Sequence, residues 1–149
     1  ELFSGLTGVI DVIVGYTGGN TVDPLYDAVK QGYTGHAEAI KIIFYTTQIS
    51  YEEILKFFFK IHDPTNINRQ GNDIGTQYRS EIFHVNEYQK NTAERIIEDG
   101  NKSGVFNKKI VTRVTKLQKF YEAENYHQDY LKKNPEGYTC HRIRHDWDF

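Results

Sequence analysis

A long polar segment, residues 62–80, constrains the fold of this chain more than any other stretch. It reads HDPTNINRQGNDIGTQYRS and follows the apolar run FFFKI, which is typical of a buried helix. Its asparagines, aspartates and glycines favour turns over regular elements. An irregular segment of this length inside a compact domain is usually either functional or disordered. Because strong elements flank it and it contains Ile67, Ile74 and Tyr78, we expect an ordered loop.

The composition limits the class of protein. The chain has 149 residues, enough for one domain with a sizeable core. Its 18 Lys and Arg residues are balanced by 20 Asp and Glu residues, whereas nucleic-acid binding needs a basic face. No stretch approaches the ~20 apolar residues of a membrane span, and we expect a cytoplasmic protein. The single cysteine, Cys140, excludes an internal disulfide scaffold and a cysteine-rich zinc site.

Strand-like and helix-like segments alternate irregularly along the chain. Short β-branched runs predict strands, and apolar periodicity between capping and stop residues predicts helices. We therefore predict a single α+β domain over residues 1–149, with a mixed sheet, packed helices and long irregular loops. The predicted strands are 8–16, 36–45, 80–85 and 110–117, the predicted helices are 24–31, 49–62 and 86–99, and 120–134 is a short helix or an ordered turn.

Two helix boundaries carry explicit sequence signals. Ser50 and Glu53 have the spacing of a capping box, in which each side chain binds the backbone N–H of the other residue. Gly100 follows the last periodic residue of the helix predicted at 86–99. Because glycine commonly follows the last turn of a helix, we expect this helix to stop there.

One glutamate lies on an apolar strand face. In AEAIKIIFY, alternation places Glu38 on the same face as Ile40 and Ile42, with Lys41 on the other face. If the apolar face is the core face, burial would raise the pKa of the Glu38 carboxyl and suit it to general acid catalysis. The alternative is a glutamate at a strand end that turns to solvent or pairs with an arginine, since most glutamates are exposed.

The polar loop offers further side chains for a site. We expect it to present Asp73, Gln77, Tyr78 and Arg79, because binding residues concentrate on structured loops. The alternative is that these side chains only satisfy backbone groups of the loop. Weaker signals come from the GYTGG turn at 15–19, which lacks the spacing of a nucleotide-binding loop, and from six histidines without metal-site spacing.

Five motifs, in this order and spacing, carry a resemblance to a known family. They are GYTGG at 15–19, TGHAEA at 34–39, RQGND-x-GTQYRS within the polar loop, FYEAENYHQDYL at 120–131 and NPEGY at 134–138. Together they resemble the A-type peptide methionine sulfoxide reductases, over residues 2–138 of this chain. The loop motif is long and specific, and it implies that the polar loop forms a wall of the sulfoxide site.

The resemblance implies reduction of methionine S-sulfoxide, free and in proteins, as a repair reaction under oxidative stress. In that family a cysteine thiolate attacks the sulfoxide sulfur while an acid protonates the oxygen, which leaves methionine and a cysteine sulfenic acid. A second cysteine condenses with the sulfenic acid to a disulfide, and thioredoxin reduces it. The expected partners are oxidised methionine in peptides or proteins and thioredoxin, with no nucleic acid, membrane, cofactor or metal.

The resemblance also implies roles for individual residues. By position, Glu38 resembles the family's acid, and Asp73 resembles a carboxylate that helps to orient the substrate. Tyr26 resembles a tyrosine that hydrogen-bonds the sulfoxide oxygen, and Tyr78 resembles its partner. Two phenols and a protonated carboxyl would stabilise negative charge on that oxygen. We therefore expect Glu38 to be buried against apolar neighbours and close to both phenols.

The chain departs from the family pattern in its cysteines. The family's Gly-Cys-Phe-Trp-Gly segment, whose cysteine is the nucleophile at a helix N-terminus, is not in this sequence. Alignment of LFSGLTGV places that segment just upstream of Glu1, and we expect the 149 residues alone to be inactive. Cys140 resembles the resolving cysteine, one residue later than in many members, and the alternative is a bystander thiol on a tail. A second open function is a non-catalytic binder of oxidised methionine peptides.

Overall fold

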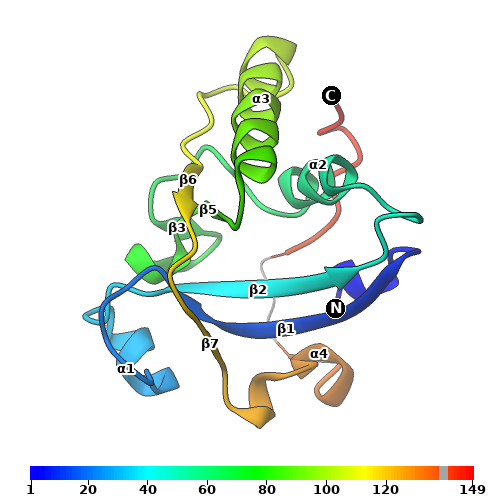
Figure 1. Cartoon of the computed structure of the whole chain (residues 1–149). Coiled ribbons are helices and arrows are strands. Elements are labelled where there is room, and N and C mark those ends of the chain that lie inside the picture. The colour runs from blue at the N-terminus through cyan, green and yellow to red at the C-terminus, as the bar shows by residue number, and fades with distance from the viewer. Residues whose placement is uncertain (138–140) are drawn as a thin grey trace.

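The computed structural model describes residues 1–137 and 141–149. At its centre, three antiparallel strands form a sheet in the order β2-β1-β7 (Figure 1). Strand β1 spans Val9–Thr17, β2 spans Ala37–Phe44 and β7 spans Phe120–Glu122. The β-branched residues that predicted the first two strands suit a pleated, half-buried surface.

Two smaller strand pairs accompany this sheet. β5 (Glu81–His84) and β6 (Arg113–Lys116) pair in parallel. β3 (Arg69–Gln70) and β4 (Asp73–Ile74) form an antiparallel ribbon inside the polar loop. Parallel and antiparallel pairing are both present, as predicted, but they occur in separate sheets and not within one mixed sheet.

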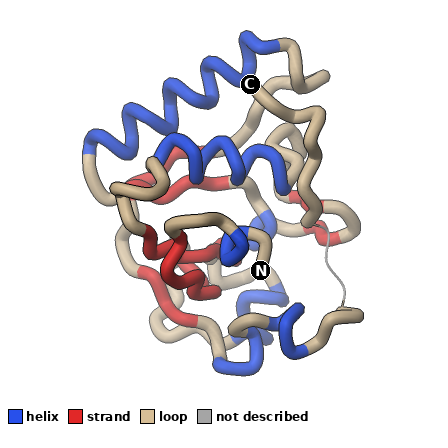
Figure 2. Tube along the Cα trace, turned by 90° about the vertical axis from the view of Figure 1, so that its right-hand side faces the viewer, coloured by secondary structure: helices blue, strands red, loops and turns tan. Residues whose placement is uncertain are grey.

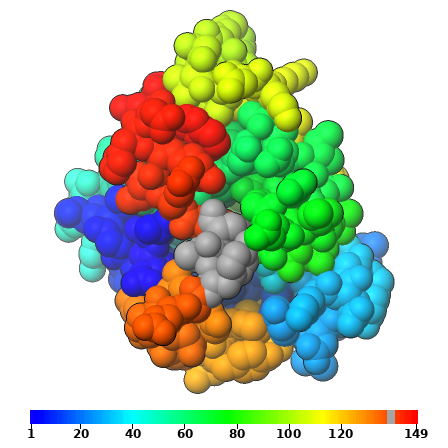
Figure 3. Space-filling view, turned by 180° about the vertical axis from the view of Figure 1, so that it is seen from behind, coloured from blue at the N-terminus to red at the C-terminus, as the bar shows by residue number. Residues whose placement is uncertain are grey.

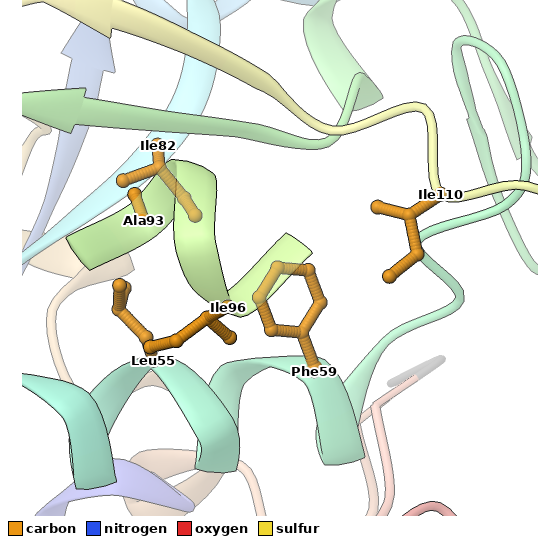
Figure 4. Close-up of a cluster of buried hydrophobic side chains, with 6 residues drawn as sticks. All are labelled: Leu55, Phe59, Ile82, Ala93, Ile96 and Ile110. Atoms are coloured by element: carbon orange, nitrogen blue, oxygen red, sulfur yellow. The ribbon is translucent and has the colours of Figure 1, made fainter. Parts of the chain in front are cut away.

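Helices α2 and α3 lie together at one end of the molecule (Figures 1 and 2). α2 spans Tyr51–Ile61, and α3 spans Glu87–Ser103. α3 supplies the long crossover connection that a parallel strand pair such as β5 and β6 requires. A cluster of buried apolar side chains fills the space between these elements (Figure 4). Its members are Leu55, Phe59, Ile82, Ala93, Ile96 and Ile110.

A second apolar cluster joins α2 to the central sheet. It includes the short 3-10 helix η1 (Phe3–Gly5) near the N-terminus. The cluster covers the sheet toward the C-terminal end of β2 and leaves the start of that strand outside it. Its buried members are Phe3, Ile49, Ile54 and Ile61, and Val12, Ile42 and Phe44 of the sheet pack against them.

Short helices gather at the end of the molecule opposite α3 (Figures 1 and 2). α1 spans Tyr26–Gln31, η3 spans Asn125–His127 and α4 spans Tyr130–Lys133. The segment predicted at 120–134 as a helix or turn thus contains η3 and α4 but begins with strand β7, which pairs with β1. Among the described residues, no helix combines the length and apolar character needed to cross a membrane.

The helix boundaries test the two capping signals. The Ser50 hydroxyl accepts a hydrogen bond from the Glu53 N–H at 3.0 Å, and the Glu53 carboxylate accepts one from the Ser50 N–H at 3.4 Å, which confirms the capping box. The predicted stop at Gly100 is wrong, because α3 continues to Ser103 and is capped by Gly104, whose φ of 76° is left-handed. Gly100 instead permits close packing, since a Cβ there would lie 2.7 Å from Ile110 Cδ1.

The C-terminal residues 141–149 pack back onto the helical end. The Arg144 N–H donates a hydrogen bond to the Lys60 carbonyl at 2.9 Å. The rings of Trp147 and Phe149 lie 5.1 and 5.8 Å from the ring of Phe106, measured between centroids. In Figure 3 this tail (red) lies between the N-terminal segment (dark blue) and the region near residue 105 (yellow-green).

Candidate active site

Glu38 lies near the start of β2 and shares a face with Ile40 and Ile42, as alternation predicted. Across the sheet it pairs with Tyr16 of β1. The expectation that Glu38 is buried is wrong: the residue is exposed, and the neighbouring Ile40 keeps 40% of its surface. The physical reason is that the second apolar cluster covers this face only farther along the strand, at Ile42 and Phe44.

The surroundings of the Glu38 carboxyl nevertheless favour its neutral form. Desolvation, followed by the negative charge of Asp73, raises the pKa of Glu38 from 4.5 to about 7. The side chain is thus open to solvent on one side while protein displaces water from the others. A carboxyl whose pKa lies near neutral pH can hold a proton and also give it up, as general acid catalysis requires.

Two phenols share this electrostatic environment. Tyr78 ends the 3-10 helix η2 (Thr76–Tyr78), which packs against β2. Burial, followed by the charges of Glu38 and Asp73, raises the pKa of Tyr78 to about 12. Tyr26 begins α1, and burial followed by the charge of Glu38 raises its pKa as well. The structure therefore brings the four predicted groups into electrostatic reach of one another.

Asp73 is held by an ordered loop, as the sequence predicted. Arg69 pairs with Ile74 and Gln70 pairs with Asp73 in the ribbon of β3 and β4. The buried Gln70 amide accepts a hydrogen bond from the Asp63 N–H at 3.0 Å and donates one to the Asp63 carbonyl at 2.7 Å. The Gln70 side chain thus forms with the Asp63 backbone the pair of hydrogen bonds that a neighbouring strand would otherwise form.

His62 and Ser80 connect the two ends of this loop. His62 Nδ1 donates to the Phe58 carbonyl at 2.6 Å, and His62 Nε2 accepts from the Ser80 hydroxyl at 2.7 Å. The Ser80 hydroxyl also lies 2.6 Å from the Thr112 hydroxyl. Burial lowers the pKa of His62 to about 4, so the ring is neutral and can accept the serine hydrogen bond.

Two of the predicted loop side chains serve the fold instead of a ligand. Gln77 Nε2 donates to the Lys30 carbonyl at 2.9 Å, which links η2 to the end of α1. The half-buried Arg79 pairs with Glu81 at 2.5 Å and donates to the Gly35 carbonyl at 3.0 Å. These contacts differ from the alternative interpretation, because Lys30, Gly35 and Glu81 lie outside the polar loop. They fix η2 against α1 and against the turn before β2.

The His36 ring is hydrogen-bonded to the backbone of the GYTGG turn. The Gly19 N–H donates to His36 Nδ1 at 3.0 Å, so the ring proton is on Nε2, which donates to the Thr21 carbonyl at 2.7 Å. Gly19 packs so closely that an added Cβ would lie within 2.4 Å of the His36 backbone. The turn is therefore a structural support for the start of β2, where Glu38 lies.

Glu124 is a residue that the sequence reasoning missed. Its carboxylate accepts hydrogen bonds from the Tyr16 hydroxyl at 3.1 Å, the Tyr26 N–H at 3.0 Å and the Tyr126 hydroxyl at 3.1 Å. Burial alone would raise the pKa of Glu124, but its hydrogen bonds outweigh burial and lower it. The available signal was a carboxylate placed among aromatic residues in FYEAENYH.

Cys140, the residue that resembles the resolving cysteine, lies outside the described residues. The described chain reaches Gly137, whose N–H donates to the Asn134 carbonyl at 2.8 Å, and resumes at His141. The role of Cys140 therefore stays a prediction, as do the catalytic roles of the four residues that the structure does bring together.

Comparison with known proteins extends the resemblance to nearly the whole chain. Residues 1–148 match the family profile described as peptide methionine sulfoxide reductase. The peptide methionine sulfoxide reductase MsrA of Mycolicibacterium gilvum (strain PYR-GCK) is 51% identical over 147 residues, which cover 99% of this chain and 85% of that protein.

Solved structures share the fold. Mxr1 from Saccharomyces cerevisiae in reduced form is similar with a TM-score of 0.87 and 37% identity, over 92% of this chain and 79% of that chain. The structure of Mxr1 in complex with Trx2 is similar with a TM-score of 0.59 and 23% identity, over 92% of this chain and 73% of that chain, which supports the fold alone. The predicted α+β class is confirmed.

Fold and sequence together define a class of enzymes that reduce a sulfoxide. Within that class, the chain belongs to the peptide methionine sulfoxide reductase family, in its A-type branch.

Proposed function

We propose that this chain provides the acid and the oxygen-binding groups of a reductase that acts on methionine S-sulfoxide, free and in proteins. The observation that carries the proposal is the raised pKa of Glu38, about 7, in a setting shared with two phenols and Asp73. Two phenols and a partly protonated carboxyl that influence one another electrostatically provide the kind of proton donors that suit an oxygen gaining negative charge.

Glu38 is the proposed general acid. With a pKa of about 7, a substantial fraction of its carboxyl is protonated at neutral pH and available to the sulfoxide oxygen. Its exposure suits this role, because the proton must reach a substrate that arrives from solvent. Asp73 acts through its charge, which raises the pKa of Glu38, and through its place on the ordered loop, where it orients the substrate.

Tyr26 and Tyr78 are the proposed hydrogen-bond donors to the same oxygen. Burial and nearby carboxylates raise the pKa of each phenol above its usual 10. Both hydroxyls therefore keep their protons across the physiological range, and each can donate a hydrogen bond. The two donors come from η2 and α1, which the Gln77 side chain connects through the Lys30 carbonyl.

The sulfur chemistry needs two thiols. A cysteine thiolate attacks the sulfoxide sulfur, the oxygen passes to that cysteine as a sulfenic acid, and methionine leaves. The thiol of Cys140 then attacks the sulfenic sulfur, which releases water and forms a disulfide, and a dithiol of the thioredoxin type reduces it by exchange. Because Cys140 is the one cysteine in these 149 residues, we propose that they do not turn over alone.

Substitution of Glu38 tests the acid role. In the complete gene product, with dithiothreitol as reductant, Glu38→Gln should slow reduction of methionine sulfoxide by about 100- to 10,000-fold, as loss of general acid catalysis typically does. Glu94→Gln, an exposed glutamate on α3, is the matched control and should leave the rate unchanged. A wild-type rate and pH profile in Glu38→Gln would exclude Glu38 as the acid.

The cysteine assignment has its own test. The 149-residue chain should show no turnover, whereas Cys140→Ser in the complete gene product should keep its first turnover and lose most thioredoxin-driven cycling. Full thioredoxin activity in Cys140→Ser would make Cys140 a bystander. Binding of oxidised methionine peptides by the complete product without any turnover would favour the non-catalytic alternative. A cytoplasmic location and a single domain over residues 1–149 remain parts of this proposal.

A further inference from the structure

One carboxylate ties together the two sides of the candidate active site. The Glu124 oxygens accept from Tyr16 of β1, from Tyr26 of α1 and from Tyr126 of η3. Tyr16 belongs to the sheet that carries Glu38, and Tyr26 is one of the two proposed oxygen-binding phenols. The arrangement therefore connects the strand of the acid to the helix of a hydrogen-bond donor.

The link to Tyr26 replaces a missing helix cap. The N-cap position of α1 is Leu25, whose side chain has no acceptor, and the first N–H groups of a helix need one. Glu124 Oε2 supplies it to the Tyr26 N–H from a distant part of the chain. Because Tyr26 is the first residue of α1, this bond holds the backbone from which its phenol side chain extends.

The link to Tyr16 fixes the other side. Tyr16 keeps 2% of its surface exposed, and its hydroxyl donates to Glu124 Oε1. In the register of β1 and β2, Tyr16 is the direct partner of Glu38. Residues paired in this way project on the same face of a sheet, about 5 Å apart. A carboxylate that holds Tyr16 therefore holds the nearest neighbour of the proposed acid.

Glu124 itself sits on a rigid support. The Gln128 amide accepts from the Val14 N–H at 2.8 Å and donates to the Val14 carbonyl at 2.9 Å, in the manner of a paired strand. The Ala123 N–H donates to the same Val14 carbonyl at 2.9 Å. Next to Glu124, the His127 ring lies against the Tyr26 ring, with centroids 4.2 Å apart.

We propose that Glu124 is a positioning residue for the sulfoxide site, which holds Tyr26 at a fixed distance and direction from Glu38. It acts through Tyr16 and Tyr26 and does not touch the substrate. The inference rests on the proposed function, because it assumes that Tyr26 and Glu38 act on one oxygen. Its contribution is geometric: the phenol and the carboxyl must converge on the same atom in the transition state.

Glu124→Gln is the direct test, because the amide keeps the size but one of its two acceptors becomes a donor. In the complete gene product with dithiothreitol, we expect kcat to fall about 10- to 100-fold, the effect of a misplacement near 1 Å. KM should change little, because substrate binding does not involve Glu124. Tyr126→Phe is the matched control: it removes the most exposed of the three hydrogen bonds and should leave kcat unchanged.

Tyr16→Phe keeps the proposal testable if Glu124→Gln does not fold. It removes one hydroxyl from a buried ring and breaks only the link to the sheet, so we expect a smaller loss of kcat in the same direction. Carbon-13 NMR of labelled tyrosine rings in the 149-residue chain gives a readout without turnover. The Tyr26 signal should move in Glu124→Gln and stay in place in Tyr126→Phe.

The outcomes separate this inference from the proposed function. If Glu38→Gln abolishes activity but folded Glu124→Gln and Tyr16→Phe keep the wild-type kcat, Glu124 has no positioning role and the inference is overturned. If Glu38→Gln itself keeps the wild-type rate, the proposed function has failed, and the inference fails with it. A fall in thermal stability with kcat and the Tyr26 signal unchanged would also overturn it, because Glu124 would then serve stability alone.

Discussion

The helical region and the site region of this protein are held together in different ways. In the helical region, formed by α2, α3, β5 and β6, aliphatic and aromatic side chains fill the space between elements (Figure 4). In the site region, formed by α1, the start of β2 and residues 62–80 and 120–128, buried and half-buried polar side chains bond to backbone groups of other segments. The first arrangement is stabilised by the total apolar area that it buries, and the second depends on individual atom pairs.

This difference relates structure to function. The free energy gained by burying apolar surface is roughly proportional to the buried area and does not depend on direction. It therefore stabilises the fold without requiring one orientation of each polar group. Hydrogen bonds have strict geometry, and a buried one that loses its partner costs the desolvation of the group left behind. A site that must direct two phenols and a carboxyl at one atom benefits from the second kind of contact. Substitutions in the two regions should therefore have different consequences.

The largest effect on stability is expected in the helical region. Phe59 is fully buried in the cluster between α2 and α3. Phe59→Ala should lower the free energy of unfolding by about 3–5 kcal/mol, through lost transfer energy and a cavity. Urea unfolding measures this, with Tyr33→Ala, 73% exposed, as a control expected within about 0.5 kcal/mol of wild type. A loss no larger than that of the control would show that this cluster does not dominate stability.

The next effect is a pH dependence in the polar loop. Burial lowers the pKa of His62 from 6.5 to about 4, so the unfolded chain binds more protons than the folded one between these values. Its contribution is present above pH 6.5 and is lost as the pH falls toward 4; at pH 5 the loss is about 2 kcal/mol. Glu38 acts in the opposite sense, because its raised pKa favours the folded state as the pH falls from 7 toward 4.5.

A difference measurement isolates the histidine. The free energy of unfolding at pH 7.5 and at pH 5 should change by about 2 kcal/mol less in His62→Gln than in wild type, because glutamine does not titrate. His145→Gln, an exposed histidine, should behave as wild type. An equal pH dependence in all three proteins would remove His62 as a source of acid sensitivity.

A smaller effect is expected where a side chain completes the edge of β1. Gln128→Leu leaves the Val14 N–H without its partner, while the Val14 carbonyl keeps the Ala123 N–H. The expected loss is about 1–2 kcal/mol, the cost of an unsatisfied backbone group. Gln118→Leu, at an exposed position, is the control for the change in side-chain chemistry. If both variants unfold at the same urea concentration, the Gln128 contacts do not stabilise the site region.

The same division explains what could be predicted from the sequence. Ser50 and Glu53 lie three residues apart, so the capping box is a local signal, and the structure confirms it. Gly100 misled the helix prediction because its reason is the close approach of Ile110 and Phe149, which no local pattern records. Gly100 thus serves long-range packing inside α3 and does not end the helix.

The residues of the site region were predicted mainly from the family motifs, and only Glu38 was also predicted from strand alternation. Alternation placed Glu38 on the correct face, but it could not show that the second apolar cluster ends before Glu38. The duties of Arg79 and Glu124 depend on partners that lie far away in the sequence, such as Gly35 and Tyr16. A hydrogen bond between a side chain and a distant backbone group produces no periodic pattern in the sequence, so it could not be predicted.

The proposed role of Glu38 as general acid requires that the protein keep its carboxyl partly protonated at neutral pH, and a titration measures this. Carbon-13 NMR of labelled glutamate in the 149-residue chain should give Glu38 a pKa of about 7, against its usual 4.5. Asp73→Asn should lower that value only in part, because desolvation is the larger cause and the charge of Asp73 the smaller one. A Glu38 that titrates near 4.5 in the folded protein would show that its surroundings do not favour the neutral carboxyl.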